Sequence, residues 1–320
     1  MGSNSAARDD PVDRLLAPGI WQIDTFLGGW AEVNSVFLIE AEQPALIETG
    51  PERDLDHVIR GLSRRGLGPE DLAWIVLSHI HLDHAGAVGE IARRFPKAKV
   101  VCHPKGLRHL ADPARLNAAS AQVYGARLDS LYGLMAPVDP GRLVGAEDGA
   151  RIDLGAGREL TLVYSPGHAK HHIGILESGS GILLVGDAVG VKLPGAGPLR
   201  PATPPDDFDL DQAVDSLHRF SALQPKQLIL THFGSAGPPE DVLRDAEDRL
   251  RTWAAVASTA YQQEPQLAHV ENALREHLGA GFKGDPERQP AADTLTGLAS
   301  NAAGLYGWLE RQAQRQSEVS

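Results

Sequence analysis

Four side chains that can bind a metal ion lie within six consecutive positions of the sequence: His79, His81, Asp83 and His84. They directly follow an apolar run typical of a β-strand, and loops at strand ends present side chains to a cleft. A lone histidine is more often a hydrogen-bonded core or surface residue than a ligand. Three imidazoles and one carboxylate this close together are hard to explain in that way, and divalent ions such as zinc prefer this mixture of donors. The segment therefore predicts a metal site.

The spacing of these residues, His-x-His-x-Asp-His, resembles the signature of the metallo-β-lactamase superfamily. Three later segments fall in the order of that family, and the resemblance covers about residues 18–235. The run Thr-Leu-Val-Tyr-Ser-Pro-Gly-His ends at His168, Leu-Leu-Val-Gly-Asp ends at Asp187, and Leu-Ile-Leu-Thr-His ends at His232. The first motif alone is moderately specific, but four motifs in order make a strong resemblance.

The resemblance implies both a fold and a site with two metal ions. The fold is an α/β (α+β) structure, a four-layer αββα sandwich, with the site at one end of its two packed sheets. Transferred position by position, the family's ligands for the first metal are His79, His81 and His168. Those for the second metal are Asp83, His84 and His232, with Asp187 bridging the two ions.

Two divalent ions held in this way would share one water molecule and lower its pKa toward neutrality, so that a bridging hydroxide attacks the substrate. The resemblance implies zinc as the first choice of metal, with iron and manganese as alternatives. It also gives Asp83 a catalytic role, as the residue that orients the water and passes on its proton.

Two segments depart from the family's usual pattern. The family has Asp-Thr-Gly after an early strand, whereas residues 47–50 read Ile-Glu-Thr-Gly. That carboxylate normally lies behind the ligands and steadies them, so we expect Glu48 to do the same with one more methylene group. Two further histidines, His171 and His172, follow His168 closely. We expect His172 to lie behind the ligands or at a strand start, and His171 to be exposed.

The elements that must position these residues follow from hydrophobic periodicity. Runs rich in valine, isoleucine and leucine predict strands at residues 21–26, 33–40, 45–48, 74–78, 98–102, 160–164, 173–177, 182–185 and 227–230. Helical spacing of apolar residues predicts helices at residues 54–67, 85–95 and 209–223 and a largely helical segment at 104–134. Strands in each half that alternate with helices favour two sheets packed face to face, with helices outside.

Beyond residue 239 the strand signals stop. Apolar stripes at helical spacing predict helices around residues 243–261, 267–278 and 295–309, which form a wall of the substrate pocket or a homodimer contact. The predicted organisation is a disordered tail at residues 1–12, a metallo-β-lactamase-like domain at 13–238 and a helical C-terminal extension at 239–320. We expect the extension to supply no metal ligand.

Composition narrows the class of protein further. The 320 residues are 42% hydrophobic and 22% charged, as in ordinary globular proteins. The 30 basic and 42 acidic residues give a net charge of −12, which disfavours nucleic acid as a partner. A single cysteine, Cys102, excludes an intrachain disulfide. We find no secretion signal and no apolar run long enough to span a membrane, so we expect a cytoplasmic protein without a membrane partner.

These observations favour a hydrolase that resembles the glyoxalase II and lactonase branches and cleaves a thioester, a lactone or a similar ester in a small-molecule substrate. A true β-lactamase is disfavoured because those enzymes are exported, and because many use a cysteine where this sequence has Asp187. Three alternatives stay open. They are a persulfide dioxygenase with one iron ion, a phosphodiesterase or nuclease of the same fold, and a binding module with a structural metal.

The substrate pocket is expected to involve segments that differ between branches, namely residues 28–30, 115–137 and the loop 192–207, which is rich in proline and glycine. Within them we predict pocket positions at Trp30, Tyr124, Tyr132 and Lys192. Their mixed, mildly apolar composition suits an acyl chain or a ring better than a polyanion. Lys192 and Arg200 are candidates either for binding a carboxylate of the substrate or for ordinary solvated surface charge.

Overall fold

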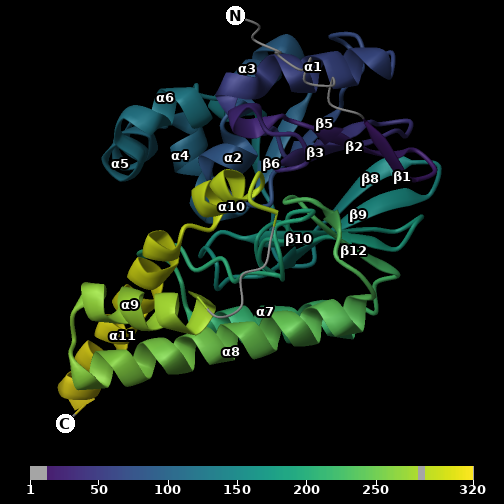
Figure 1. Cartoon of the computed structure of the whole chain (residues 1–320). Coiled ribbons are helices and arrows are strands. Elements are labelled where there is room, and N and C mark those ends of the chain that lie inside the picture. Colours follow the sequence, from purple (N-terminus) through teal and green to yellow (C-terminus); the bar gives the residue numbers. More distant parts are fainter. Residues whose placement is uncertain (1–12, 280–284, 320) are drawn as a thin grey trace, which may run out of the picture.

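The computed structural model describes residues 13–279 and 285–319, so the disordered tail predicted for residues 1–12 lies outside the described residues. Within them, the strands form two sheets that face each other, and helices cover the outer face of each sheet (Figure 1). This is the predicted four-layer αββα arrangement of the α/β class. No described helix combines the length and the apolar character needed to cross a membrane.

The first sheet follows the order of the chain. In the described residues it consists of β1 (Arg14–Ala17), β2 (Ile20–Asp24), β3 (Ser35–Ile39), β4 (Ala45–Ile47), β5 (Trp74–Val76), β6 (Lys99–Cys102) and β7 (Leu143–Gly145). Neighbouring strands are antiparallel from β1 to β4 and parallel from β4 to β7. The parallel strands end at one edge of the sheet, and residues 78–84 leave from that edge after β5.

The second sheet is built from the later half of the sandwich. Its described strands are, in spatial order, β13 (Gly234–Ser235), β12 (Gln227–Leu230), β11 (Ile182–Leu184), β10 (Ile173–Glu177), β9 (Arg158–Tyr164) and β8 (Arg151–Gly155). Only β11 and β12 are parallel among these neighbouring strands. Because they are parallel, the segments that carry Asp187 and His232 leave the sheet at the same edge.

The alternation of side chains along each strand determines which residues fill the space between the sheets. On β10, Ile173 and Ile175 lie in the core between the sheets, whereas Gly174 faces outward to α7 (Leu210–Ala222). A Cβ atom at Gly174 would lie 2.5 Å from the ring of Phe220 on that helix. The glycine therefore allows α7 to pack directly on the sheet.

Helices form the two outer layers (Figure 1). On the side of the first sheet lie α1 (Leu55–Arg64), α2 (Leu82–Ala85), α3 (Val88–Arg94), α4 (Leu107–Ala111), α5 (Ala114–Tyr124) and α6 (Leu128–Leu131). On the side of the second sheet lie α7, α8 (Pro239–Gln263), α9 (Leu267–Gly279) and α11 (Leu298–Val319). Helix α7 begins where the sequence predicts, because the carboxylate of Asp209 accepts a hydrogen bond from the N–H of Gln212.

The described C-terminal segment is divided differently from the prediction. Residues 295–309 are not one helix: α10 (Gln289–Leu295) ends at Leu295, Thr296 leaves the helical conformation, and α11 begins at Leu298. Helix α10 packs against the core beside the first sheet, whereas α11 packs with α8 and α9 beside the second. The break between α10 and α11 therefore allows the C-terminal segment to contact both outer layers. The apolar stripe in the sequence is continuous and does not reveal this break.

Candidate metal centre

All seven predicted ligands lie at one edge of the sandwich, where the chain leaves the carboxyl ends of strands. Four of them belong to residues 79–84, which follow β5 and run into the short helix α2. The other three, His168, Asp187 and His232, follow β9, β11 and β12. The fold thus brings together donors from four distant parts of the chain, and they form two adjacent groups.

The first group consists of His79, His81 and His168, whose ring nitrogens converge. His81 Nδ1 lies 3.0 Å from His79 Nε2 and 3.1 Å from His168 Nε2. Asp187 adds a fourth atom, because its Oδ2 lies 3.6 Å from His168 Nε2. Ligand atoms around a tetrahedral zinc ion with bonds of about 2.0–2.1 Å lie roughly 3.4 Å apart. These distances therefore fit one divalent ion.

The second group consists of Asp83, His84 and His232. His84 Nε2 lies 3.6 Å from Asp83 Oδ2 and 3.4 Å from Asp187 Oδ1. His232 Nε2 lies 3.4 Å from Asp83 Oδ2 and 3.5 Å from the same oxygen of Asp187. The two oxygens of Asp187 therefore face different groups, as expected of a carboxylate that bridges two ions.

Two buried atoms of this cluster have no hydrogen-bond partner within the described residues, His84 Nε2 and Asp187 Oδ1. A buried polar atom without a partner costs free energy, and native structures rarely retain one without a reason. The two atoms lie 3.4 Å apart in the second group, where one cation would satisfy both. The donor set and these unpaired atoms together fit a site for divalent metal ions.

In His168 and His232, the ring nitrogen that points away from the donor groups is held by an acceptor, which sets the orientation of the ring. His168 Nδ1 lies 2.9 Å from the carbonyl oxygen of Ala202, and His232 Nδ1 lies 2.8 Å from that of Val33. A carbonyl oxygen only accepts, so each of these nitrogens carries the proton. The Nε2 atoms then present their lone pairs to the two groups, which is the tautomer that metal binding requires.

Glu48, predicted to lie behind the ligands, is buried next to His84. Its Oε1 lies 3.3 Å from His84 Nδ1, and its Oε2 accepts a hydrogen bond of 3.2 Å from the N–H of Ser78. The backbone φ at Glu48 is 63°, a conformation that costs a residue with a side chain about 1–3 kcal/mol. The extra methylene group of glutamate thus still allows one carboxylate to connect His84 with the segment that follows β5.

His172 lies behind Asp187. Its Nε2 accepts a hydrogen bond of 3.2 Å from the N–H of Asp187, so it holds the backbone of that residue. A Cβ atom at Gly186 would come within 2.5 Å of this nitrogen, so a glycine is needed there. The expectation that His171 is exposed is wrong, because the residue is half-buried with its ring 6.1 Å from that of His81.

The electrostatics of the site differ between its two donor groups. Burial and the neighbouring imidazoles lower the pKa of His79 well below 6.5 and that of His81 to about 4, so both rings are neutral. Burial would raise the pKa of Asp187, but the imidazole of His84 above all holds it well below 3.8. Burial would lower the pKa of His84, but the carboxylate of Asp187 above all raises it well above 6.5. The second group therefore attracts a cation, either a proton or a metal ion.

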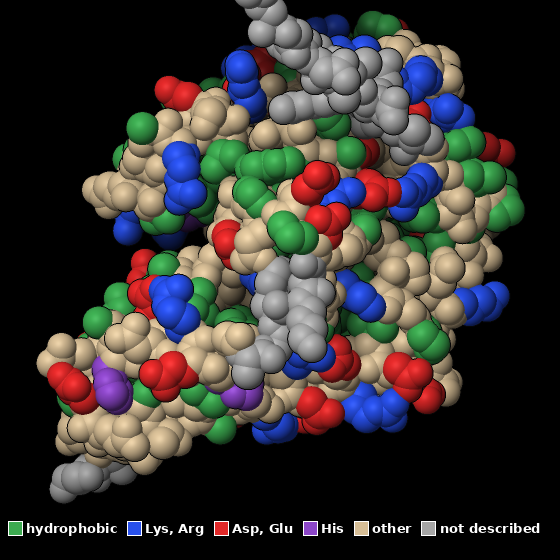
Figure 2. All heavy atoms as spheres, in the orientation of Figure 1, with side chains coloured by type: hydrophobic (Ala, Val, Ile, Leu, Met, Phe, Trp, Pro, Cys, Tyr) green, Lys and Arg blue, Asp and Glu red, His purple; other side chains and the backbone are tan. Residues whose placement is uncertain are grey.

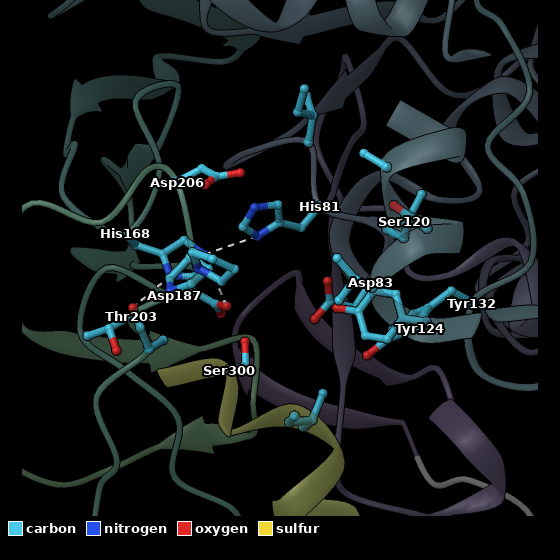
Figure 3. Close-up of a pocket in the computed structure, with 18 of the residues that line it drawn as sticks. His81, Asp83, Ser120, Tyr124, Tyr132, His168, Asp187, Thr203, Asp206 and Ser300 are labelled. Carbon is cyan, nitrogen blue, oxygen red and sulfur yellow. Dashed lines mark hydrogen bonds and ion pairs between the residues drawn. The ribbon is translucent and has the colours of Figure 1, made fainter. Parts of the chain in front are cut away.

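A cavity of about 280 Å³ opens onto the ligands His81, Asp83, His168 and Asp187 (Figure 3). One wall comes from α5 and the residue after α6, a second from residues 202–206, and a third from the end of α10 and the start of α11. In Figure 3 the second wall lies on the side of His168, and the first lies on the side of Asp83.

Two predicted pocket residues, Tyr124 and Tyr132, line this cavity beside Asp83 (Figure 3). Their ring centroids are 4.7 Å apart. Burial raises the pKa of Tyr124 to about 12, and that of Tyr132 well above 10. Both phenols therefore remain protonated at neutral pH and are able to donate hydrogen bonds.

The other two pocket predictions, Trp30 and Lys192, are corrected by the structure, because neither residue lines the cavity. The ring of Trp30 folds over Gly28, where a Cβ atom would lie 2.6 Å from it, and packs against the core outside the first sheet. Lys192 extends away from the site, and its Nζ donates a hydrogen bond of 2.9 Å to the carbonyl oxygen of Ala236.

Sequence reasoning missed the residues that complete the site from loops and from the C-terminal helices. The carbonyl of Ala202 orients His168, but a backbone acceptor leaves no signal in residue types. Ser300 and Asn301 line the cavity from α11. A pocket wall formed by the C-terminal helices was one of two expectations, but an apolar stripe identifies only the packed face of a helix and not the polar residues that reach the cavity.

Glutamine in place of Glu48 tests the connection to His84. Glutamine keeps the shape and the acceptor for Ser78, but its amide places an N–H group opposite His84 Nδ1. The His84 proton then moves to Nε2, the nitrogen that faces the second group. We expect Glu48→Gln to lower the Zn²⁺ affinity of the metal-free protein about 10–100-fold, measured by calorimetric titration.

Glu70→Gln is the matched control, because Glu70 is exposed and pairs with Lys97 at the surface. It should bind Zn²⁺ as the unaltered protein does. An unchanged affinity in Glu48→Gln would contradict the role assigned to Glu48.

Known proteins of similar sequence place the chain in a family. A profile of the metallo-beta-lactamase superfamily matches residues 28–232. The metallo-beta-lactamase fold-containing protein ST1585 of Sulfurisphaera tokodaii is 32% identical over 172 residues, which are 53% of this chain and 63% of that protein. The N-acyl homoserine lactonase AiiB of Agrobacterium fabrum is 28% identical over 175 residues, which are 53% of this chain and 60% of the lactonase. The chain thus spans less than two thirds of the length of either relative.

Solved structures share the fold at lower identity. The crystal structure of ST1585 from Sulfolobus tokodaii matches with a TM-score of 0.67 and 23% identity, over 91% of this chain and 98% of that one. The metallo-beta-lactamase family protein TTHA1429 from Thermus thermophilus matches with a TM-score of 0.63 and 21% identity, over 94% and 95%. The superfamily profile covers well over half of this chain. The chain therefore belongs to the metallo-beta-lactamase superfamily.

Proposed function

We propose that this protein is a metal-dependent hydrolase that cleaves an ester-type bond, a lactone or a thioester, in a small molecule. The observation that carries the proposal is the position of Asp187. Its two oxygens face two groups of metal-binding side chains at one end of an open cavity. Membership of a superfamily whose members are mostly hydrolases supports the proposal.

The site suits hydrolysis without a serine or cysteine nucleophile. Divalent ions bound by the two groups would lower the pKa of a coordinated water toward neutrality and so supply hydroxide. Asp83 lines the cavity, where its carboxylate is placed to orient that water and to carry a proton toward the leaving group. Cys102 is not a competing nucleophile, because burial raises the pKa of its thiol to about 12.

The two tyrosines supply polar contacts in a cavity whose lining is part apolar and part polar. Tyr124 and Tyr132 lie on the side of Asp83 (Figure 3), and the hydroxyl of Tyr132 donates a hydrogen bond to that of Tyr124. The hydroxyl of Tyr124 keeps its own proton to donate to a substrate carbonyl oxygen. Such donors stabilise the negative charge that develops on that oxygen during attack. Around them, apolar residues of α5 and prolines of the facing loop suit an acyl chain or a ring.

The similarity to the lactonase AiiB supports a lactone, rather than a thioester, as the substrate. Two of the alternatives have less support. A dioxygenase with one iron ion would leave unused the second group, a complete set of donors formed by Asp83, His84 and His232. A purely structural metal is disfavoured because the ligands line an open cavity, whereas structural zinc sites are closed.

A phosphodiester substrate also has less support. None of the described residues that line the cavity is lysine or arginine, the usual partners of phosphate. On the face drawn in Figure 2, acidic and basic side chains are interspersed among the described residues. Nucleic acid binding calls for a basic patch or stripe instead.

Outside the metal site, the charged side chain at the cavity favours a cationic part of a substrate over an anionic one. Apart from the metal ligands, Asp206 is the charged residue among the described ones that line the cavity, and it is exposed at the rim. The two candidates for binding a carboxylate lie elsewhere. Lys192 contacts Ala236, and Arg200 lies outside this cavity, 3.6 Å from Asp293. The prediction that they bind a substrate carboxylate is therefore not retained.

The reaction is tested with neutral lactones and thioesters on protein loaded with Zn²⁺. We expect turnover that rises as the pH passes through the pKa of the coordinated water, about 7 for a zinc site, because hydroxide is the nucleophile. Removing the metal with a chelator should abolish turnover, and adding Zn²⁺ back should restore it. Rapid consumption of bis-aryl phosphates or of persulfides, without turnover of the lactones and thioesters, would contradict the proposal.

The charge preference is tested with two aryl esters of equal size, one bearing a quaternary ammonium group and one its neutral isostere. An exposed charge contributes about 1 kcal/mol, so Asp206→Asn should lower kcat/KM for the cationic ester about fivefold and leave the neutral ester unchanged. Asp207→Asn is the matched control, because Asp207 pairs with Lys170 at 2.8 Å and does not line the cavity. An equal effect of Asp206→Asn on both esters would argue against a role for this charge.

A further inference from the structure

The orientation of His168 depends on one backbone carbonyl. Its Nδ1 lies 2.9 Å from the oxygen of Ala202, and in this orientation its Nε2 lies 3.1 Å from His81 Nδ1 and 3.6 Å from Asp187 Oδ2. Ala202 belongs to residues 201–204, which form neither a helix nor a strand. No ladder of backbone hydrogen bonds therefore holds this carbonyl, and its position depends on contacts from elsewhere in the fold.

Before Ala202, a backbone bridge joins Arg200 to Val191. After Ala202, the contacts come from Asn301, in the first turn of α11. The N–H of Thr203 donates a hydrogen bond of 2.7 Å to Asn301 Oδ1. The Thr203 hydroxyl lies 2.8 Å from the same oxygen and 3.0 Å from the Asn301 carbonyl oxygen, and its single proton serves one of them at a time. Thr203 is 1% and Asn301 4% exposed, so water does not compete for these bonds.

The backbone after Ala202 also lies directly against α11. A Cβ atom at Gly304, one turn beyond Asn301, would lie 2.0 Å from the carbonyl oxygen of Thr203 and 2.6 Å from that of Pro204. The helix itself is held firmly, because Leu305 is fully buried in the core that α11 shares with α8 and α9. Helix α11 thus offers a fixed surface on which this irregular segment rests.

We propose that Asn301 is a positioning residue of the metal site: through Thr203 it holds the Ala202 carbonyl that orients His168. Among the described residues, the C-terminal helices contribute no member of the two donor groups, yet one of these helices sets the geometry of a ligand. The inference rests on metal binding by the first group. It does not depend on which bond the enzyme cleaves.

The test is the Zn²⁺ affinity of the full-length Asn301→Ala variant, measured by competition with a chromophoric chelator. Loss of the amide leaves the Thr203 N–H without its acceptor and allows residues 201–204 to shift away from His168. Removing a group behind a metal ligand typically weakens binding 10–100-fold, and we expect about tenfold here because Asn301 acts through a further residue. With Co²⁺ as the probe, the visible absorption of the bound ion should change as well, because the arrangement of its ligands changes.

A second variant keeps the test decisive if Asn301→Ala does not fold. Thr203→Val removes the hydroxyl but keeps the N–H bond to Asn301, so it should weaken Zn²⁺ binding less than Asn301→Ala. An unchanged affinity in Asn301→Ala would overturn the inference. If that variant does not fold, an unchanged affinity in Thr203→Val would overturn it.

Leu274→Ala is the matched control for a general loss of stability. Leu274 is fully buried in α9, in the same outer layer as α11, and does not line the cavity. Its truncation should lower Tm while leaving the Zn²⁺ affinity and the Co²⁺ spectrum unchanged. An equal loss of affinity in Leu274→Ala and Asn301→Ala would overturn the inference. An unaltered protein that binds no Zn²⁺ would overturn the metal site as well, so the two failures are distinguishable.

Discussion

The carboxylate of Asp187 imposes the main physical constraint on this fold. Removing a carboxylate from water is costly unless hydrogen bonds, opposite charges or a metal ion compensate, and Asp187 is only 7% exposed. Its two oxygens lie 3.4–3.6 Å from the ring nitrogens of His84, His168 and His232. These histidines come from separate segments, so the ends of strands in both sheets must meet at one edge of the sandwich. The topology achieves this with parallel strands in each sheet.

The residues that contact the metal ligands from behind meet the same constraint. Each polar contact there holds a ring or a backbone group in the orientation that the donor groups need. Glu48 lies against His84, His172 accepts from the N–H of Asp187, and the carbonyl of Ala202 orients His168. The last of these contacts extends the site to α11, through Thr203 and Asn301. The C-terminal helices are therefore part of the support of the metal centre and of the cavity wall.

How much the sequence predicts depends on how local each feature is. Residues 79–84 could be recognised directly, because four donors lie within one short segment. His168, Asp187 and His232 required family motifs, since nothing in their spacing says that three distant strand ends meet. The direction of Lys192 could not be predicted, because it depends on a tertiary contact with Ala236. The break at Thr296 was missed for a similar reason: an apolar stripe does not record a change of packing partner from one outer layer to the other.

The central claim is that the two donor groups hold two divalent ions that share Asp187. Metal content per chain, measured by mass spectrometry on protein purified without chelators, tests it most directly. The account predicts about two ions per chain for the unaltered protein and about one for His84→Ala, which removes a donor of the second group only. A firm value of one ion per chain in the unaltered protein, unchanged by His84→Ala, would contradict it.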